Sequence, residues 1–533
     1  MKINMSSSST ASTTPQPEFG KIRAALWPIH NDELKKFLPM GLILFCTLFI
    51  YTMLRDTKDT LVVTAEDGGA AMIPFLKLGV TLPAAVFFVV LYSKLSNVLS
   101  REKLFYSVVT GFLLFFGLFA LWFYPNRATL HPDPVYIQGL KDAAPNFQHW
   151  FSVAGLWSYS AFYVLSELWG TVMITLLFWQ FANEVTRTIE AKRFYGFFGL
   201  IANFSLIASG FTIKLMSDIR NSYPDDVDAW GISINYMMSA VVVVGIAMMA
   251  IYRWMNANVL TDPRYYDAAE SSGKTKSKKP KLSIIESFKY VFSSKYLGFI
   301  AILVIGYGLC INLVEIVWKS QLKLQYPNSN DYSAFMGKFS ATTGIVTIVM
   351  IMMFKGVVRR FGWFTGAIIT PAMLIVTSLA FFGFVIFSEY TSSWASVFGT
   401  TPLMLAVLFG AAQNISSKGT KYALFDPTTQ MSYIPLDQEL KVKGKAAVDV
   451  VGSRLGKAGG GLVAGGLLMI TAAADVLTVA PILAVFVTAM ILLWMYAVGG
   501  LNKLYNGLIA AQEADDAKAP TTKAGKKPTK AAA

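Results

Sequence analysis

Charged side chains interrupt several long apolar stretches of this sequence. Lys58 follows an apolar run, Glu167 is the only acid in its stretch, and Glu315 and Lys457 lie in two further stretches. A charge near the centre of a bilayer-spanning helix costs at least about 2.5–3.5 kcal/mol on insertion scales, so it must meet a counter-charge or line a wet cavity. These four residues are therefore the first candidates for binding chemistry.

The two lysines lack a partner in their own helices. Lys58 and Lys457 have no acidic residue three or four positions away. A solvated helix end is the alternative interpretation for Lys58, because its neighbours Arg55 and Asp59 are spaced to pair with each other. We favour a cation that is free for an anionic ligand, since lysine binds phosphate as a compact point charge and can release it.

The two acids differ in their local surroundings. Glu167 has no nearby cation in sequence, so a residue of another helix must neutralise it, whereas Glu315 can pair with Lys319 four residues on. A purely structural role is thus a stronger alternative for Glu315. One lysine and one acid in each half of the chain suit a central cavity for a multiply anionic solute. The acids would hold Lys58 and Lys457 while the site is empty and be displaced by phosphate.

Other chemistries find little support. Both cysteines lie in apolar blocks and all three histidines lie outside them, so we expect no disulfide scaffold, metal site, bound cofactor or enzymatic nucleophile. Gly452, Gly456 and Lys457 resemble a phosphate-binding loop, but their spacing is wrong, and close packing of neighbouring helices is the expected role of these glycines. The net charge of +14 comes from short basic loops and tails, which indicates membrane orientation and not nucleic-acid binding.

Apolar blocks dominate the composition. The chain has 533 residues, of which 54% are hydrophobic and 15% charged, against about 25% charged in an average soluble domain. We predict an all-α integral membrane protein, because a block of about 20 apolar residues crosses a bilayer as a helix. The twelve expected spans lie at residues 38–63, 71–96, 103–124, 150–181, 195–216, 232–256, 295–320, 333–356, 362–388, 399–415, 447–472 and 476–505.

Basic residues predict the orientation of these spans. Lys and Arg gather in alternate connections, while the opposite loops, such as 125–150, are poor in them. The positive-inside rule places the basic loops and both termini in the cytoplasm, or in the stroma of a plastid. The connection 418–446 is predicted to be a cytoplasmic, basic and amphipathic loop, with a structural role favoured over a gate.

The order of the segments predicts two six-helix halves around a central cavity, as in the major facilitator superfamily. The expected units are a disordered tail (1–35), a first half (36–256), a basic linker (257–294), a second half (295–505) and a disordered Lys/Ala-rich tail (506–533).

Several longer strings resemble one known family. The strings that carry the likeness are Arg55–Thr64, Ile73–Lys77, Tyr332–Gly337, Lys418–Thr428 and Ile434–Asp449. They are similar to the plastid and intracellular-bacterial ATP/ADP translocases, and the resemblance runs from about residue 20 to 505.

This resemblance implies counter-exchange of ATP and ADP across a bilayer without hydrolysis. It also implies that the family's four charged residues important for transport correspond to Lys58, Glu167, Glu315 and Lys457. A monomer in a bacterial inner membrane or a plastid inner envelope is expected. Because relatives with similar motifs move other ribonucleotides with protons, or NAD, a proton-coupled importer of ribonucleoside triphosphates or another nucleotide is the alternative.

Weaker candidates for further substrate contacts are Arg55, Tyr163, Asn203, Asn312 and Asn414. Adenine needs an apolar or aromatic slot with amide or hydroxyl groups nearby. For each of these polar residues, a bond to another helix is the alternative.

Overall fold

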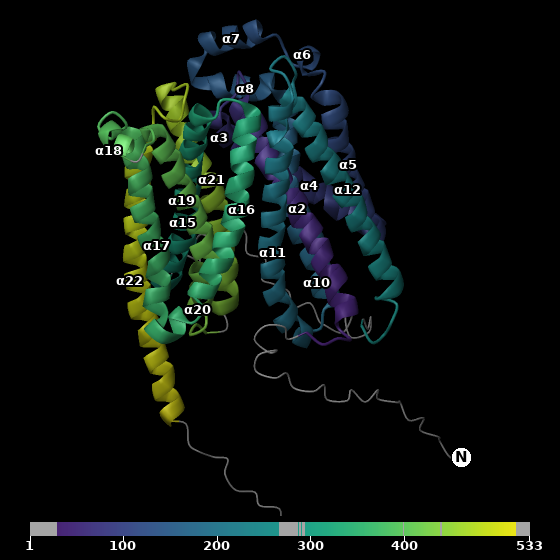
Figure 1. Ribbon diagram of the computed structural model, residues 1–533. Coiled ribbons are helices and arrows are strands. Elements are labelled where there is room, and N and C mark those ends of the chain that lie inside the picture. The colour runs from purple at the N-terminus through teal and green to yellow at the C-terminus, as the bar shows by residue number, and fades with distance from the viewer. Residues whose placement is uncertain are drawn as a thin grey trace, which may run out of the picture.

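A computed structural model describes residues 29–265, 286, 289, 294–397, 399–437 and 440–518, and inside these ranges the side chains of a few residues, Lys457 among them, lie outside the description. Every secondary-structure element in the described residues is helical (Figure 1). Ten of these described helices are long and apolar enough to cross a membrane. The structure therefore confirms an all-helical protein with multiple membrane spans.

The helices fall into two groups along the chain. The first helix group contains α2 (Leu34–Thr64), η1 (Ala70–Met72), α3 (Ile73–Phe75), η2 (Leu76–Thr81), α4 (Leu82–Val98), α5 (Arg101–Leu118), η3 (Phe119–Phe123), α6 (Arg127–Leu130), α7 (Pro134–Ala143), η4 (Pro145–Phe147), α8 (Gln148–Gly155), α9 (Trp157–Trp169), η5 (Gly170–Phe178), α10 (Trp179–Val185), α11 (Thr188–Ser217), η6 (Asp218–Ser222) and α12 (Ala229–Asn258). The second helix group contains α15 (Lys295–Gln325), α16 (Ser329–Met353), α17 (Val357–Ile386), α18 (Ser392–Val397), α19 (Pro402–Thr420), η7 (Lys421–Phe425), α20 (Asp426–Ser432), η8 (Leu440–Gly444), α21 (Lys445–Thr471) and α22 (Ala480–Lys518).

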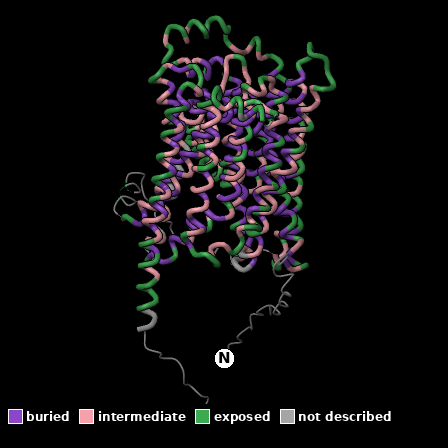
Figure 2. The backbone as a smooth tube through the Cα atoms, turned by 60° about the vertical axis from the view of Figure 1, so that its left-hand side comes forward, coloured by how far each residue is buried: buried purple, intermediate pink, exposed green. Residues whose placement is uncertain are grey.

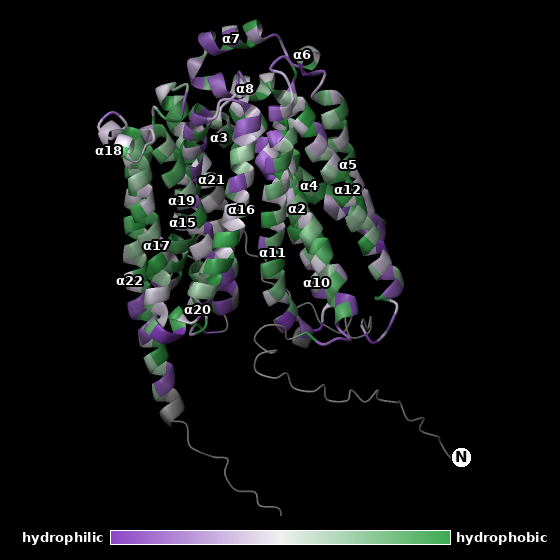
Figure 3. Cartoon of the chain, in the orientation of Figure 1, coloured by the Kyte–Doolittle hydropathy of each residue, from purple (hydrophilic) through white to green (hydrophobic). Residues whose placement is uncertain are grey.

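Apolar side chains cover the outside of the bundle as well as its interior. Exposed examples come from helices of both groups, namely Phe87, Leu121, Val243, Val376 and Val485. Figure 2 shows exposed and intermediate residues along the outer helices, and Figure 3 shows hydrophobic residues along their length with hydrophilic residues gathered at the two ends. A large exposed apolar surface of this kind is typical of contact with lipid.

The tenth and eleventh expected spans differ from the other ten. Helices α19 and α21 occupy these positions but do not belong to the ten long apolar helices of the described chain. The loop predicted at 418–446 is wrong over most of its length, because α19 continues through η7 and α20 to Ser432, and η8 and α21 follow from Leu440. The wider π turn η7 ends at Phe425, two residues before Pro427. Because Pro427 has no backbone N–H, it cannot donate the hydrogen bond of a regular helical turn there.

The predicted tails and linker lie mainly outside the described residues. This holds for most of the tail expected at 1–35 and most of the linker expected at 257–294. The tail expected to begin at 506 starts instead as helix, since α22 continues to Lys518. Its alanine-rich sequence has high helix propensity, which explains the extension.

Glycines allow close helix packing both between the two helix groups and within the second group. An added Cβ on Gly210 of α11 would lie 2.5 Å from the carbonyl oxygen of Gly337 on α16, and one on Gly337 would lie 2.6 Å from the carbonyl oxygen of Gly210. In the second group, Gly456 of α21 rests against Gly308 of α15. The packing role predicted for the glycines of α21 is therefore confirmed at Gly456.

One end of the bundle is closed by contacts between the two groups. In Figure 1 the groups lie close together at the end that carries α7 and further apart at the end where α2 begins and α22 ends. Side chains at η4 and α8 donate to backbone oxygens after α21 or at its end: Asn146 to Met469 at 2.6 Å, Gln148 to Ala472 at 3.0 Å and His149 to Ala473 at 2.9 Å. The last carbonyls of a helix lack the full set of partners that a continuing helix supplies, so the region of η4 and α8 caps α21 from the other group.

Candidate functional site

The C-terminal turns of α2 carry a group of buried charges. Helix α2 packs against α9, α11, α12 and α16, so helices surround it on several sides. Asp56, Lys58 and Asp59 are all at most 2% exposed. Successive residues of a helix point about 100° apart, so these charges meet partners on different neighbouring helices.

Lys58 is held by two carboxylates and an aromatic ring. Its Nζ lies 2.7 Å from Oδ1 of Asp59 and 3.1 Å from Oε1 of Glu167 on α9. The same Nζ lies 3.8 Å from the centre of the Tyr163 ring, a cation–π distance. Glu167 does find its partner on another helix, as expected. The prediction that Lys58 has no partner in its own helix is wrong, because the adjacent Asp59 pairs with it.

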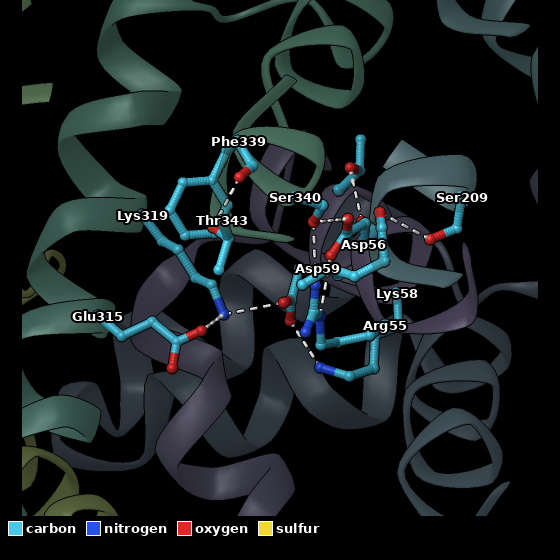
Figure 4. A network of polar contacts seen from close by, with 12 residues as sticks. Arg55, Asp56, Lys58, Asp59, Ser209, Glu315, Lys319, Phe339, Ser340 and Thr343 are labelled. Atoms are coloured by element: carbon cyan, nitrogen blue, oxygen red, sulfur yellow. Dashed lines mark hydrogen bonds and ion pairs between the residues drawn. The ribbon is translucent and has the colours of Figure 1, made fainter. Parts of the chain in front are cut away.

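Asp59 joins the two helix groups. Its second oxygen accepts a 2.8 Å hydrogen bond from Lys319 on α15, and Lys319 also lies 2.9 Å from Oε1 of Glu315 (Figure 4). The result is a charge chain with alternating signs: Glu167, Lys58, Asp59, Lys319 and Glu315. Alternation is what permits five ionised groups to share a low-dielectric region.

Arg55 belongs to a second cluster beside the charge chain. It pairs with Asp56 at 3.0 Å and donates a 3.0 Å bond to Ser340 on α16, which in turn donates to Asp56 at 2.6 Å (Figure 4). The Arg55–Asp59 pair that helical spacing permits, part of the alternative interpretation, does not form, because Arg55 pairs with Asp56 instead. Asp59 is already occupied by two lysines, and Asp56 offers Arg55 a carboxylate with its own hydroxyl partner.

Only the ends of the charge chain reach solvent. The side chains of Glu167 and Glu315 are 30% and 28% exposed, whereas those of Lys58, Asp59 and Lys319 are at most 3% exposed. Three acids and two lysines leave the charge chain with one net negative charge. An anionic solute would therefore need further cations nearby, in addition to displacing a carboxylate from a lysine.

Two such cations lie around the charge chain, and sequence reasoning did not select them. Lys77 of η2 and Lys418 of α19 are both among the electrostatic partners of Glu315. Lys77 donates a 3.0 Å bond to Asn312, and Lys418 lies 5.0 Å from the centre of the Phe339 ring. Both stand near the ends of predicted apolar segments, where a lysine ordinarily extends to the membrane surface, so no sequence signal distinguished them.

The three asparagines among the weaker candidates each bond within their own helix, and Asn312 also accepts the hydrogen bond from Lys77. Asn203, Asn312 and Asn414 each donate to the carbonyl four residues earlier, at 2.8–2.9 Å. The hydroxyl of Tyr163 is buried and has no hydrogen-bond partner among the described residues. Lys457 lies on α21, and its side chain is outside the description.

The family model described as "TLC ATP/ADP transporter" matches residues 12–505. A carrier of Chlamydia pneumoniae, named ADP,ATP carrier protein 1, is 52% identical over 502 residues, covering 94% of this chain and 97% of its own. The protein of that name from Rickettsia bellii is 43% identical, with coverage of 93% and 99%. A chloroplastic ADP,ATP carrier of Arabidopsis thaliana is 44% identical, with coverage of 92% and 77%.

Solved structures share the fold at low sequence identity. A bacterial homologue of the iron transporter ferroportin, in an inward-facing state, aligns with a TM-score of 0.56 at 12% identity, covering 89% of this chain and 99% of that one. A nucleoside transporter aligns with a TM-score of 0.53 at 13% identity, with coverage of 86% and 99%. The fold is thus one used by membrane transporters.

Proposed function

The chain belongs to the TLC ATP/ADP transporter family, and from this premise we propose that it exchanges ATP for ADP across a membrane by alternating access. The observation that carries the proposal is the charge chain, which crosses from the first helix group to the second through the Asp59–Lys319 pair. A site built from both groups changes its exposure when the groups rock against each other.

In the proposed cycle, phosphates replace carboxylates on the site lysines. Lys58 and Lys457 bind the phosphates, while Glu167 and Glu315 hold cations when no nucleotide is present. The buried pairs of Lys58 support this role, because a lysine that already has two anionic partners needs a strong anion to displace one. An empty carrier would then keep its charges paired and move little, which favours exchange over one-way leakage.

The proposed architecture has twelve spans in two six-helix halves around a central cavity, with α19 and α21 as the tenth and eleventh. The end that carries α7 faces outward, and both termini lie in the cytoplasm or stroma. The cation-poor segment around α7 supports this orientation. We further propose a monomer in a bacterial inner membrane or plastid inner envelope, with no catalytic activity and no nucleic-acid partner.

The test is counter-exchange by purified protein in proteoliposomes. Labelled ATP should enter vesicles loaded with ADP and should stay outside vesicles loaded with buffer alone. ATP uptake that ignores the internal nucleotide would overturn the exchange assignment.

A proton-coupled importer on the same scaffold is the second candidate, because the partly exposed carboxylates of Glu167 and Glu315 offer groups that could carry a proton. The same vesicles distinguish the two. A pH gradient that drives ATP into ADP-free vesicles would favour the importer.

A further inference from the structure

Lys77 is a cation of the central site with an unusual partner. It lies in η2 at the start of the membrane segment Ala70–Val98, and its side chain is half buried. The only hydrogen-bond acceptor that the described residues give it is the neutral amide oxygen of Asn312, at 3.0 Å. Lys58 and Lys319, in contrast, each contact two carboxylates.

The position of Lys77 connects it to both ends of the charge chain. Its electrostatic partners are Glu315 and Glu167, and the like charges of Lys319 and Lys58 also act on it. Glu167 and Glu315 are the two partly exposed carboxylates of the charge chain, so Lys77 interacts electrostatically with the two groups of the chain that a solute can reach.

Asn312 holds this lysine across the boundary between the two helix groups. Its Nδ2 donates to Gly308 at 2.8 Å, which fixes the amide so that Oδ1 is the atom that faces Lys77. A neutral amide gives up a lysine more readily than a carboxylate does, because the amide carries no opposite charge and the contact lacks the attraction of an ion pair. The lysine is therefore positioned in the site without being neutralised.

We propose that Lys77 is a third phosphate-binding residue of the nucleotide site and that Asn312 positions it while the site is empty. The inference rests on the proposed function and adds a specificity role to it. A third cation increases the affinity that each additional phosphate contributes. Lys77 therefore makes the site prefer nucleoside di- and triphosphates over monophosphates.

The experiment measures how unlabelled ATP, ADP and AMP compete with labelled ATP during exchange into ADP-loaded proteoliposomes. In Lys77→Gln, the half-inhibitory concentration of ATP should rise at least about tenfold, as expected when one charge-assisted contact is lost. That of AMP should rise less than about twofold. Lys77→Arg should stay close to wild type, and Lys503→Gln, which removes an exposed lysine of α22, should match wild type.

The variant Asn312→Asp tests the role of Lys77 independently. The new carboxylate would neutralise Lys77, so this variant should weaken ATP competition as Lys77→Gln does, although Lys77 is still present. Where exchange by a variant is too slow, the increase in Tm of the solubilised protein with added ATP or AMP reports the same preference.

The outcomes separate the two proposals. Wild-type protein that fails to exchange ATP for ADP overturns the proposed function. The role of Lys77 alone is overturned if the wild-type protein exchanges ATP for ADP and the Lys77→Gln variant has unchanged half-inhibitory concentrations. It is also overturned if this variant loses affinity for ATP, ADP and AMP equally.

Discussion

Asp59 of α2 accepts a 2.8 Å hydrogen bond from Lys319 of α15, and both side chains are at most 3% exposed. The pair links the two helix groups at the centre of the charge chain. Each partner also has a second ion pair within its own group, Asp59 with Lys58 and Lys319 with Glu315. The connection between the groups can therefore break without leaving either residue wholly unpaired.

Coupling between these two residues should be measurable in the stability of the solubilised protein. Asp59→Asn and Lys319→Gln should each lower the free energy of unfolding, but by less than the about 3–5 kcal/mol that follows when a buried ion loses every partner. The double variant should lose less than the sum of the single losses, by at least about 1 kcal/mol. Additive losses in a thermal or denaturant titration would contradict a direct pair.

Removing the charge of Lys58 should impair exchange without unfolding the protein. Lys58→Met keeps most of the buried side-chain stem and removes the ammonium group. We expect the ATP exchange rate below saturation to fall about 10–100-fold, because a charge-assisted contact contributes about 1.5–3 kcal/mol. Lys503→Met is the matched control. Normal exchange by Lys58→Met, with its folding checked by gel filtration, would refute a role in phosphate binding.

The glycine contact between α11 and α16 should tolerate no side chain. Gly210→Ala places a methyl group against the backbone of Gly337, so we expect a loss of about 1–3 kcal/mol in unfolding free energy. Gly111→Ala on α5 is the control, because an added Cβ there meets nothing within 4 Å, and replacing a helical glycine with alanine should be neutral or stabilising. Equal Tm values for the two variants would show that the close contact is absent.

Acid should weaken the closed end of the bundle through His149. Burial lowers the pKa of this histidine below its ordinary value, and the nearby Lys141 also lowers it, while the bond to Ala473 and the charge of Asp475 oppose them. The unfolded chain therefore takes up the proton first as the pH falls below about 6.5, and folded stability declines from there through the lower pKa of the folded state.

His149→Phe tests this dependence, because phenylalanine keeps an aromatic ring next to Phe75, on which His149 stacks at 5.3 Å. Between pH 7.5 and 5.5, the Tm of the variant should fall less than that of wild type. Parallel decreases in Tm would assign the acid sensitivity to other groups.

Sequence patterns predicted the positions of most helices. They also predicted that Glu167 needs a cationic partner from another helix. Apolar length gave the positions of the spans, and the isolation of Glu167 required a cation from elsewhere, which is Lys58. The pattern missed that Lys58 and Asp59 pair as direct neighbours, since helical spacing considers contacts three and four residues apart. A side chain with four methylene groups is long and flexible enough to contact the adjacent Asp59 as well as Glu167 of another helix.

The remaining members of the site depend on tertiary structure. Asp59 and Lys319 are separated by most of the first helix group, and no local rule connects them. Lys77 resembled an ordinary interfacial lysine because its neighbour Asn312 arrives from the other group. Prediction from one sequence therefore identified where charges are costly, but not which charges compensate each other.

The reciprocal approach of Gly210 and Gly337 has a mechanical consequence. At Gly210 and Gly337 the backbones of the two helices meet directly, so at this one point no side-chain ridge interlocks them, and the helices resist separation there more than they resist rolling. The contact between α11 and α16 is thus suited to be the axis of a small rotation of one helix group against the other. Such a rotation would open or close the end opposite α7 while the two helices stay in contact.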